Sequence, residues 1–432
     1  MDLALRIAVI LLVLVSGLLG LIGILYLTRG NPVRGVRVLG EDDDAPDVSS
    51  PHFCLQVQTH VNTDLIEGNT VEVLFNGEDV YPRLWRELRS ARDLITWHVF
   101  WFKPGELSEE LKEILKERAR AGVTVLMLYD RFGALGVPGA YWEELRSAGV
   151  EVHAFRPFRW QDMYKWQQRT HMRAVVVDGR VGYTGGFSID DSWRGDGRHE
   201  GQWRDTSVRI TGPAVHQLQG AFAADWAEAA GDLLLGRRVF QPECLEERGP
   251  VTAGLVYGAP SVGSTDIERF FALSIAGARR RLWITNAYFV PDDDFRGFLL
   301  AAARRGVDVR VLTPGVNTDK PSTWYAGRIH YEALLEGGVR IYEYRPTMVH
   351  AKTLVADGIW SAIGTTNFDN RSMSLNDEVV LMTHSEEVAR TLEERFEYDL
   401  ELADELELET FRRRGGWERL KERFWVLFSR FL

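Results

Sequence analysis

Cysteine is scarce in this sequence, with only Cys54 and Cys244 among 432 residues. Two cysteines cannot build a disulfide framework, and neither has a cysteine or histidine neighbour at zinc-ligand spacing, so both are interpreted as inert. Excess positive charge is also lacking, because 62 acidic residues outnumber 51 lysines and arginines and give a formal net charge of −11. Loose binding of nucleic acid depends on the opposite balance, so no nucleic-acid partner is expected, although a local basic cleft is compatible with these numbers.

Beyond residue 40 the sequence has no long segment whose amino-acid composition is biased enough to suggest disorder. With 45% hydrophobic and 26% charged residues, the composition is that of an ordinary globular protein. The chain is too long for one ordinary core, so we expect two domains of roughly 150 to 200 residues. An internal duplication would fit that size.

One long apolar run is present, from Ile7 to Leu27, with 21 residues and no charge. At 1.5 Å per residue it covers a hydrocarbon core of about 30 Å, whereas the apolar part of a signal peptide has only about 7 to 15 residues. Residues 1–40 are therefore interpreted as a transmembrane anchor with its flank. More arginines follow the run than precede it, which predicts a single-pass protein of the cell (inner) membrane with its catalytic region on the cytoplasmic side.

The segments at the two ends of the folded region differ in charge. Residues 41–50 are predicted to be an acidic linker, since like charges repel and Pro46 disfavours regular structure. Residues 406–432 are predicted to form an amphipathic helix, with apolar residues at helical spacing between basic ones. Such a helix either lies in the membrane interface or packs its apolar face on the protein, and the sequence leaves both alternatives open.

The middle of the chain is similar to itself. Residues 142–157 (WEELRSAGVEVHAFRP) match residues 331–346 (YEALLEGGVRIYEYRP), and the segments upstream match in the same order, 94–102 with 282–290 and 119–130 with 303–314. Each half reads strand, helix, strand, helix, strand, and the helices end at glycines, which form left-handed caps without strain. This repeat predicts an α/β protein with two similar sandwich halves, residues 51–240 and 241–405, and largely parallel central strands.

A histidine follows each Arg-Pro element in the same register. The first half has His171-x-Arg173-x4-Asp178, and the second half has His350-x-Lys352-x4-Asp357. Residues two apart share a face of a strand, so each strand presents an imidazole beside a cation. A single histidine on an apolar strand is usually structural, but two in register in a duplicated motif favour one shared catalytic site.

These residue types suit the chemistry of a phosphodiester. That reaction needs a nucleophile for phosphorus, an acid for the leaving alkoxide, and fixed positive charge on the non-bridging oxygens. The two imidazoles can fill the first two roles, and the paired cations can fill the third. The Asn367 amide can donate to a phosphate oxygen, while Glu378 and Asp205 can either orient the imidazoles or form ordinary salt bridges.

The duplicated pattern His-x-Lys-x4-Asp-x6-Gly-x2-Asn resembles that of the phospholipase D superfamily over nearly all of residues 60–400. Segments such as TGG at 184–186, WRDTSVRITGPAV at 203–215 and AYFVPD at 287–292 are similar to those of bacterial cardiolipin synthases. The resemblance implies two phospholipase D-type halves packed as a pseudo-dimer. It also implies that two phosphatidylglycerol molecules are joined with release of glycerol, at a membrane and without a metal or another cofactor.

The resemblance also implies residue roles. One histidine, His171 or His350, would form a phosphohistidine while the other protonates the leaving glycerol. Catalytic roles would fall to the residues of the two motifs, His171, Arg173, Asp178, His350, Lys352 and Asp357, although turns before glycines alone explain both aspartates. Contacts with the phosphate or the imidazoles would come from Ser188, Asp205, Asn367 and Glu378. The chain departs from the family pattern at Arg173, where lysine is usual, and at Ser188, where asparagine is frequent.

Several alternatives stay open at this point. Water could replace the second lipid and give phospholipid hydrolysis, a nuclease could use the same residues, and a decayed site could leave a membrane scaffold. The first half alone has an aromatic-rich segment, residues 158–170 (FRWQDMYKWQQRT), which borders the lipid entrance or is an ordinary surface loop. The acyl-chain preference and the oligomeric state are not encoded in any recognisable pattern.

Overall fold

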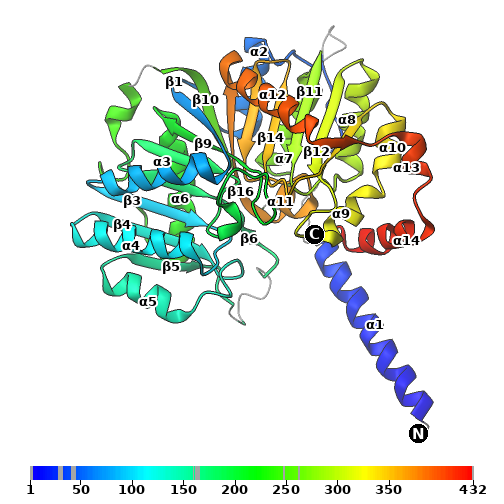
Figure 1. The fold of residues 1–432 in the computed structure, drawn as a ribbon, viewed down its shortest axis with the longest axis horizontal. Helices are drawn as coiled ribbons and strands as arrows, with labels where there is room; N and C mark the ends of the chain where they lie inside the picture. Colours follow the sequence, from blue (N-terminus) through cyan, green and yellow to red (C-terminus); the bar gives the residue numbers. More distant parts are fainter. Residues whose placement is uncertain are drawn as a thin grey trace.

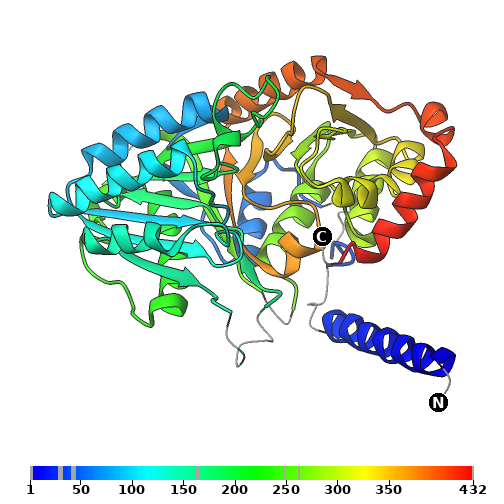
Figure 2. The same ribbon diagram turned by 60° about the horizontal axis from the view of Figure 1, so that its bottom comes forward.

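The computed structural model describes residues 3–27, 33–39, 45–158, 160, 166–246, 249–260 and 263–430. Helix α1 (Leu3–Leu27) extends away from the folded body in both Figure 1 and Figure 2. Its segment Leu5–Gly23 has a mean hydropathy of 2.7 and is not buried against any of the other residues that the structure describes. The expected apolar helix is therefore present and is long enough to cross a membrane. Residues 41–44 of the predicted acidic linker lie outside the described residues.

The first half of the repeat forms a seven-stranded sheet in the order β2-β9-β8-β7-β3-β4-β5. Its strands are β2 (Thr70–Phe75), β3 (Leu94–Val99), β4 (Thr124–Asp130), β5 (Glu151–Phe155), β7 (Ala174–Val177), β8 (Val181–Gly185) and β9 (Thr206–Thr211). One face is covered by α3 (Asn76–Ser90), α4 (Glu106–Arg120) and α5 (Gly139–Ser147), and the other by α6 (Ala214–Ala230). Alternate residues of each strand enter the two cores, as the pleat requires.

The second half forms a ten-stranded sheet in the order β1-β10-β16-β15-β14-β11-β12-β13-β17, with β6 paired to β16. The strands are β1 (Ile66–Gly68), β6 (Arg169–Thr170), β10 (Gly249–Gly258), β11 (Arg281–Asn286), β12 (Asp308–Pro314), β13 (Arg340–Tyr344), β14 (Lys352–Ala356), β15 (Trp360–Gly364), β16 (Asn376–His384) and β17 (Ala403–Glu405). Helices α2 (Pro51–Val61), α7 (Asp266–Gly277), α8 (Asp293–Arg304) and α10 (Tyr331–Glu336) cover one face. Helix α12 (Glu386–Glu401) covers the other.

Shorter elements complete the second half and the connections. They are α9 (Pro321–Arg328), α11 (Asn370–Ser374), α13 (Leu408–Arg412), α14 (Gly416–Trp425) and the 3₁₀ turns η2 (Asp191–Trp193), η3 (Pro242–Glu246) and η4 (Val426–Phe428). Helix α2 contributes Phe53, Val57 and Val61 to the core of the second half, and β1 pairs with β10. Residues 51–68 thus pack with the second half, and the sheet of the first half begins at β2.

The prediction of largely parallel central strands is only partly right. Strands β3, β4 and β5 are parallel, as are β11, β12 and β13, but β7 and β14 are antiparallel to both of their neighbours. The turn after each motif accounts for the β7–β8 and β14–β15 pairs, though not for the β3–β7 and β11–β14 pairs. Asp178-Gly179 have φ values of 53° and 61°, and Asp357-Gly358 have 55° and 73°. Two consecutive residues with positive φ make a tight hairpin, and such a turn can join only antiparallel strands.

The two halves meet through a third apolar core between α6 and α12. It joins Val176 and Val208 of the first half to Val379 and Leu381 of the second. The chain also crosses between halves, because β6 pairs with β16 and Arg204 pairs with Val349. Each histidine-bearing segment therefore lies against an extended segment of the other half, and the halves form the pseudo-dimer that the family resemblance implies.

A buried ion pair spans this interface. Arg156 at the end of β5 contacts Asp377 of β16 at 2.5 Å and Glu228 of α6 at 2.8 Å, and its side chain is only 8% exposed. Removing the guanidinium leaves the Asp377 carboxylate buried without a cation. We expect Arg156→Ala to lower the free energy of unfolding by about 3 to 5 kcal/mol, measured by thermal and denaturant unfolding in detergent.

The repeat supplies the matched control. Arg345 is the equivalent arginine of the second half, but it is 56% exposed and pairs with the exposed Asp404 at 3.4 Å. Arg345→Ala should change stability by at most about 1 kcal/mol. Equal losses in the two variants would show that the buried pair does not stabilise the interface.

Candidate active site

Both histidines are held by backbone contacts with the opposite half. His171 follows β6, and its N–H donates to the carbonyl of Asp377 at 2.8 Å. His350 precedes β14, and its N–H donates to the carbonyl of Arg204 at 2.6 Å. Both side chains are buried. Each imidazole is therefore positioned by its own strand and by one strand of the partner half.

Each imidazole also contacts a carboxylate of the other half. His171 Nδ1 lies 2.9 Å from Glu378 Oε1, and His350 Nδ1 lies 2.9 Å from Asp205 Oδ2. A carboxylate on Nδ1 fixes the tautomer and leaves Nε2 as the nitrogen that can attack or carry a proton. The structure thus places both predicted carboxylates at the imidazoles, in pairs that cross the pseudo-dimer.

Two buried cations lie beside the imidazoles. Arg173 Nη1 donates to the carbonyl of His171 at 2.7 Å, and Lys352 Nζ donates to the carbonyl of His350. The Nε atom of Arg173 is buried and has no hydrogen-bond partner among the described residues. Fixed positive charge with an unused donor suits the non-bridging oxygens of a phosphate. In the described part of the chain, no three His, Cys, Asp or Glu side chains gather as a metal site would need.

Burial and the nearby cations keep both imidazoles uncharged. Burial lowers the pKa of His171 well below its ordinary value, and Arg173 and Lys352 lower it further. Burial likewise lowers the pKa of His350, with Lys352 acting in the same direction against the opposing effect of Asp205. Since the same two cations act on both histidines, the four groups share one site. A neutral imidazole is the form that can attack phosphorus.

The two orienting carboxylates differ in charge state. Burial raises the pKa of Glu378 to about 7, and the Thr365 hydroxyl opposes that shift only partly. Burial also acts to raise the pKa of Asp205, but His350 and Lys352 outweigh it and lower the pKa to about 2. Asp205 is therefore ionised at any working pH, whereas Glu378 titrates near neutrality. The two imidazole–carboxylate pairs are alike in geometry and unlike in electrostatics.

Aromatic rings enclose the imidazoles. Phe100 lies 5.2 Å from His171, and Trp193, Trp203 and Tyr288 lie 5.0, 5.3 and 6.2 Å from His350 between ring centroids. The Trp193 ring N–H also donates to Asp205 at 2.7 Å. None of these aromatic residues was predicted from the sequence to surround an imidazole. The repeat contained a signal for two of them, because Phe100 and Tyr288 occupy equivalent positions of residues 94–102 and 282–290.

Two of the predicted contact residues differ in their surroundings. Asn367 Oδ1 is buried with no partner among the described residues, and its amide nitrogen has a long 3.4 Å contact with Ser372. The Ser188 hydroxyl instead donates to the carbonyl of Trp101 at 2.8 Å. The amide is thus free to meet a substrate, while the serine hydroxyl already bonds the backbone.

The motif aspartates lie at the opposite ends of the strands from the histidines. The Asp178 carboxylate accepts from the N–H groups of residues 92, 93 and 94 at 2.9, 2.8 and 2.9 Å. Asp357 accepts from residues 279, 280 and 281 at 2.7, 2.7 and 2.9 Å. We therefore assign both a structural role, in which they tie the hairpin turn to the start of β3 or β11. They do not reach the reacting atoms.

The chain is similar in sequence to known proteins of one family. Residues 273–400 match a family described as cardiolipin synthase, PLD-like domain. A cardiolipin synthase of Geobacillus kaustophilus is 37% identical over 351 residues, which cover 81% of this chain and 70% of that protein. Cardiolipin synthase A of Pseudomonas fluorescens is 35% identical over 365 residues, 84% of this chain and 75% of that protein. The chain belongs to the cardiolipin synthase family. The predicted resemblance is confirmed, and the protein is a phosphatidyltransferase of the phospholipase D superfamily.

Solved structures confirm the two-half architecture. A phosphatidylserine synthase of Haemophilus influenzae superposes with a TM-score of 0.66 at 14% identity, covering 88% of this chain and 99% of that one. A polyphosphate kinase of Porphyromonas gingivalis superposes with a TM-score of 0.54 at 11% identity, covering 79% and 49%. At such low identity these similarities show the fold and not the reaction.

The raised pKa of Glu378 predicts a pH-dependent stability difference. Its folded pKa of about 7 lies above the ordinary 4.5, so between these values only the unfolded chain ionises, which destabilises the fold as pH rises. Glu378→Gln removes that ionisation. The variant should match the wild type below pH 4.5 and exceed its stability by about 3 kcal/mol above pH 7, while it loses activity.

Asp205→Asn is the control variant, in which the free energy of unfolding should fall instead of rise. The Asp205 pKa is lowered from 3.8 to about 2, so its ionised form stabilises the fold above pH 4. The asparagine variant should be less stable by about 2 kcal/mol at both pH 5 and pH 8. Thermal unfolding of both variants and the wild type at these pH values tests the pair. A Glu378→Gln variant that is less stable than the wild type at pH 8 would contradict the expectation.

Proposed function

We propose that this protein transfers a phosphatidyl group from one phosphatidylglycerol molecule to another, yielding cardiolipin and glycerol through a phosphohistidine. The observation that carries the proposal is the pair of buried imidazoles, each with Nδ1 held at 2.9 Å by a carboxylate of the other half. The unprotonated imidazole supplies the nucleophile, the second imidazole supplies the proton donor once it is protonated in the substrate complex, and Arg173 and Lys352 supply the charge that the reaction needs. Family membership supports the choice of lipid substrate.

In the first step, Nε2 of His171 attacks the phosphorus of one lipid. A P–N bond forms, the P–O bond to the glycerol headgroup breaks, and His350 donates a proton to the leaving oxygen. The unlike carboxylates support this assignment, because ionised Asp205 stabilises an imidazolium at His350. The phosphate that enters the site brings negative charge, which offsets the nearby cations and favours the protonated form of His350.

In the second step, neutral His350 removes a proton from a headgroup hydroxyl of the second lipid. The resulting oxygen attacks phosphorus, the P–N bond breaks, and His171 is regenerated. Water would give phosphatidic acid by the same route. The rings of Phe100, Trp193 and Trp203 around the imidazoles favour exclusion of water, which supports transfer over hydrolysis.

The proposal places the enzyme at the cytoplasmic face of the membrane. Helix α1 would cross the bilayer, and the arginines after it, Arg29, Arg34 and Arg37, would stay on the cytoplasmic side. Phosphatidylglycerol in that leaflet would then be the substrate.

The histidine variants test the shared site. His171→Ala and His350→Ala should each lower turnover by about a thousandfold or more, since each removes one of two required groups. The assay incubates detergent-solubilised protein with phosphatidylglycerol and identifies lipids by mass spectrometry. Cardiolipin with glycerol supports transfer, whereas phosphatidic acid alone would identify a hydrolase, and no product would contradict both.

The same variants assign the nucleophile. After incubation with phosphatidylglycerol labelled in its phosphatidyl group and an acid-free quench, His350→Ala protein should retain covalent label, because loss of His350 slows the breakdown of the P–N bond as well as its formation. His171→Ala protein should retain none. Label on the His171→Ala protein alone would show that the two roles are exchanged.

A further prediction concerns Arg173, which stands where the family usually has a lysine. If Arg173 stabilises charge on the phosphate, Arg173→Gln should lower kcat by roughly tenfold to a thousandfold. Arg173→Lys should keep most of the activity, because the ammonium preserves the charge. Unchanged turnover in the glutamine variant would show that Arg173 does not contact the phosphate.

A further inference from the structure

The C-terminal helix α14 is oriented with its polar side inward. Trp417, Leu420, Phe424 and Leu427, in α14 and the following η4, are 69, 53, 52 and 71% exposed. Their spacing of three and four residues puts them on one face of the helix. The buried residue of α14, all of which is described, is Glu422, with 1% exposure. An amphipathic helix packed on a soluble protein has the reverse orientation.

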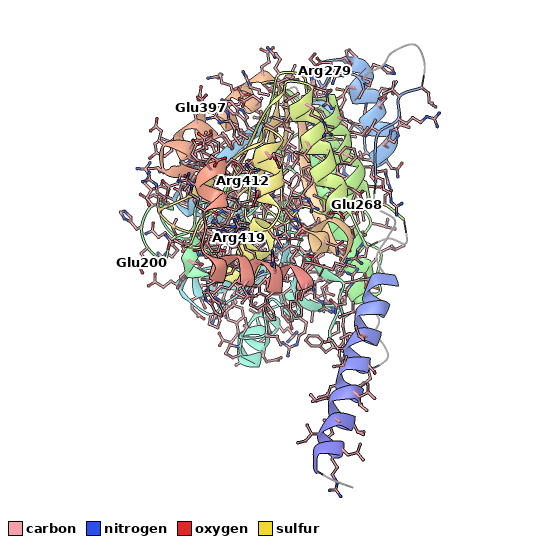
Figure 3. All side chains as sticks on the ribbon, turned by 90° about the vertical axis from the view of Figure 1, so that its right-hand side faces the viewer. Glu200, Glu268, Arg279, Glu397, Arg412 and Arg419 are labelled. Atoms are coloured by element: carbon pink, nitrogen blue, oxygen red, sulfur yellow. The ribbon has the colours of Figure 1, made fainter. Side chains whose placement is uncertain are left out.

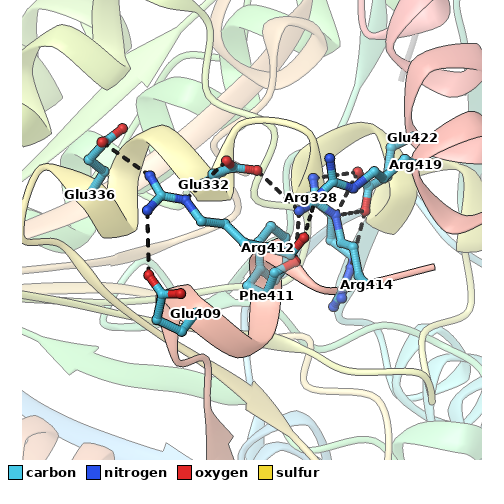
Figure 4. A network of polar contacts seen from close by, with 9 residues as sticks. All are labelled: Arg328, Glu332, Glu336, Glu409, Phe411, Arg412, Arg414, Arg419 and Glu422. Atoms are coloured by element: carbon cyan, nitrogen blue, oxygen red, sulfur yellow. Dashed lines mark hydrogen bonds and ion pairs between the residues drawn. The ribbon is translucent and has the colours of Figure 1, made fainter. Parts of the chain in front are cut away.

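Ion pairs fix this orientation (Figure 4). Glu422 accepts two hydrogen bonds of 2.9 Å from Arg414 and lies 3.7 Å from Arg328 of α9. The Arg414 guanidinium stacks 4.0 Å from the Phe411 ring, and Lys421 donates to the Tyr325 hydroxyl at 3.2 Å. Turning the apolar face inward would break the contacts of buried Glu422 with two largely buried guanidinium groups, leaving Arg414 with Glu332 and Arg328 with Glu343, which is unfavourable. The exposed apolar face is therefore held in place by the body of the enzyme.

The charge around this face points to an anionic surface. Residues 412–430 contain seven lysines and arginines and two acidic residues, in a chain whose net charge is −11; Arg412 and Arg414 pair with carboxylates, whereas Arg413 and Arg423 are exposed. Large exposed apolar side chains with basic neighbours are the pattern of helices that lie in a membrane interface. Helix α1 leaves the body on the same side as α14, as Figures 2 and 3 show. The six residue-to-residue steps from Leu27 to Val33 span at most about 22 Å, so the bilayer surface must lie close to the body.

The same surface adjoins the active site through α11, which follows Asn367 closely. Asn370 donates to the carbonyl of Arg430, at the end of the C-terminal segment, at 3.2 Å. Arg371 donates to the carbonyl of Gln167 at 3.1 Å. Gln167 follows the exposed aromatic residues Phe158, Trp160 and Trp166. Helix α11 is thus tied to two exposed apolar elements, and a headgroup arriving from that side meets α11 next to Asn367.

We infer that α14 and η4 form an interfacial helix that lies in anionic lipid, with the apolar face of Trp417, Leu420, Phe424 and Leu427 among the acyl chains beside the active-site entrance. The partner is a phosphatidylglycerol-containing lipid surface. This placement goes beyond the proposed reaction and does not require it, because the helix can be located in the bilayer whether or not the lipid is turned over.

Depth-dependent quenching tests the inference on the full chain. Cys54→Ser removes the partly exposed native thiol, Cys244 is buried, and Leu420→Cys supplies a site for a bimane label. The labelled protein is reconstituted in phosphatidylglycerol–phosphatidylcholine vesicles with or without brominated acyl chains. Because an interfacial helix buries its apolar face about 5 to 10 Å into the acyl boundary, bromolipid should quench the label by about half or more.

Glu397→Cys in the same Cys54→Ser background is the matched control. Glu397 is exposed on α12, on the side of the molecule away from α14 in Figure 3. Its label should show the same emission in both kinds of vesicle. Equal, negligible quenching at positions 420 and 397 would overturn the inference, whatever the activity of the protein. Disulfide cross-linking of the unlabelled position 420 cysteines of two copies, together with no quenching in the labelled protein, would also overturn it and assign the face to a dimer.

Discussion

The candidate active site depends on an exchange of two carboxylates, each of which contacts a histidine of the other half. Glu378 of the second half orients His171 of the first, and Asp205 of the first half orients His350 of the second. The backbone repeats the exchange, since each histidine N–H bonds a carbonyl of the other half. Neither half can therefore complete an imidazole–carboxylate pair alone. The apolar core between α6 and α12 and the buried Arg156–Asp377 pair keep these contacts in register.

The exchange is symmetric in geometry, and the electrostatic asymmetry comes from the local environment. Both carboxylates are buried, but Asp205 also accepts from the Trp193 ring and lies in the field of Lys352. Glu378 accepts from the Thr365 hydroxyl and lies near Arg173 and Lys352, but these groups lower its pKa by less than burial raises it. The two halves of a duplicated fold can thus give one histidine the role of nucleophile and the other the role of proton donor while their backbones stay similar. The two halves also differ at Ser188 and Asn367. The Ser188 hydroxyl donates to the backbone, whereas the Asn367 amide oxygen has no partner among the described residues.

Much of this arrangement could be predicted from the sequence, and the limits have physical causes. The two histidines and their cations were predictable because the repeat preserves their spacing along a strand. Glu378 and Asp205 could be named as orienting groups, but their crossed partners could not, because that pairing depends on contacts about 145 and 207 residues apart. The antiparallel direction of β7 and β14 was missed because a run of buried residues carries no strand direction. The motif aspartates were ambiguous until their carboxylates were seen to bond three backbone N–H groups each.

The C-terminal helix shows why periodicity alone cannot orient an element. Its sequence has an apolar face and a basic flank, which fit a soluble packing helix and an interfacial one equally. Glu422 is bonded by Arg414, eight residues before it, but the groups that hold Arg414 and Glu422 against the body come from distant elements, Glu332 of α10 and Arg328 of α9. Once Glu422 is buried against these groups, the leucines and aromatics of α14 must face outward. A buried active site that acts on a lipid needs such a surface nearby, since the acyl chains cannot follow the headgroup phosphate into a pocket lined by charged groups.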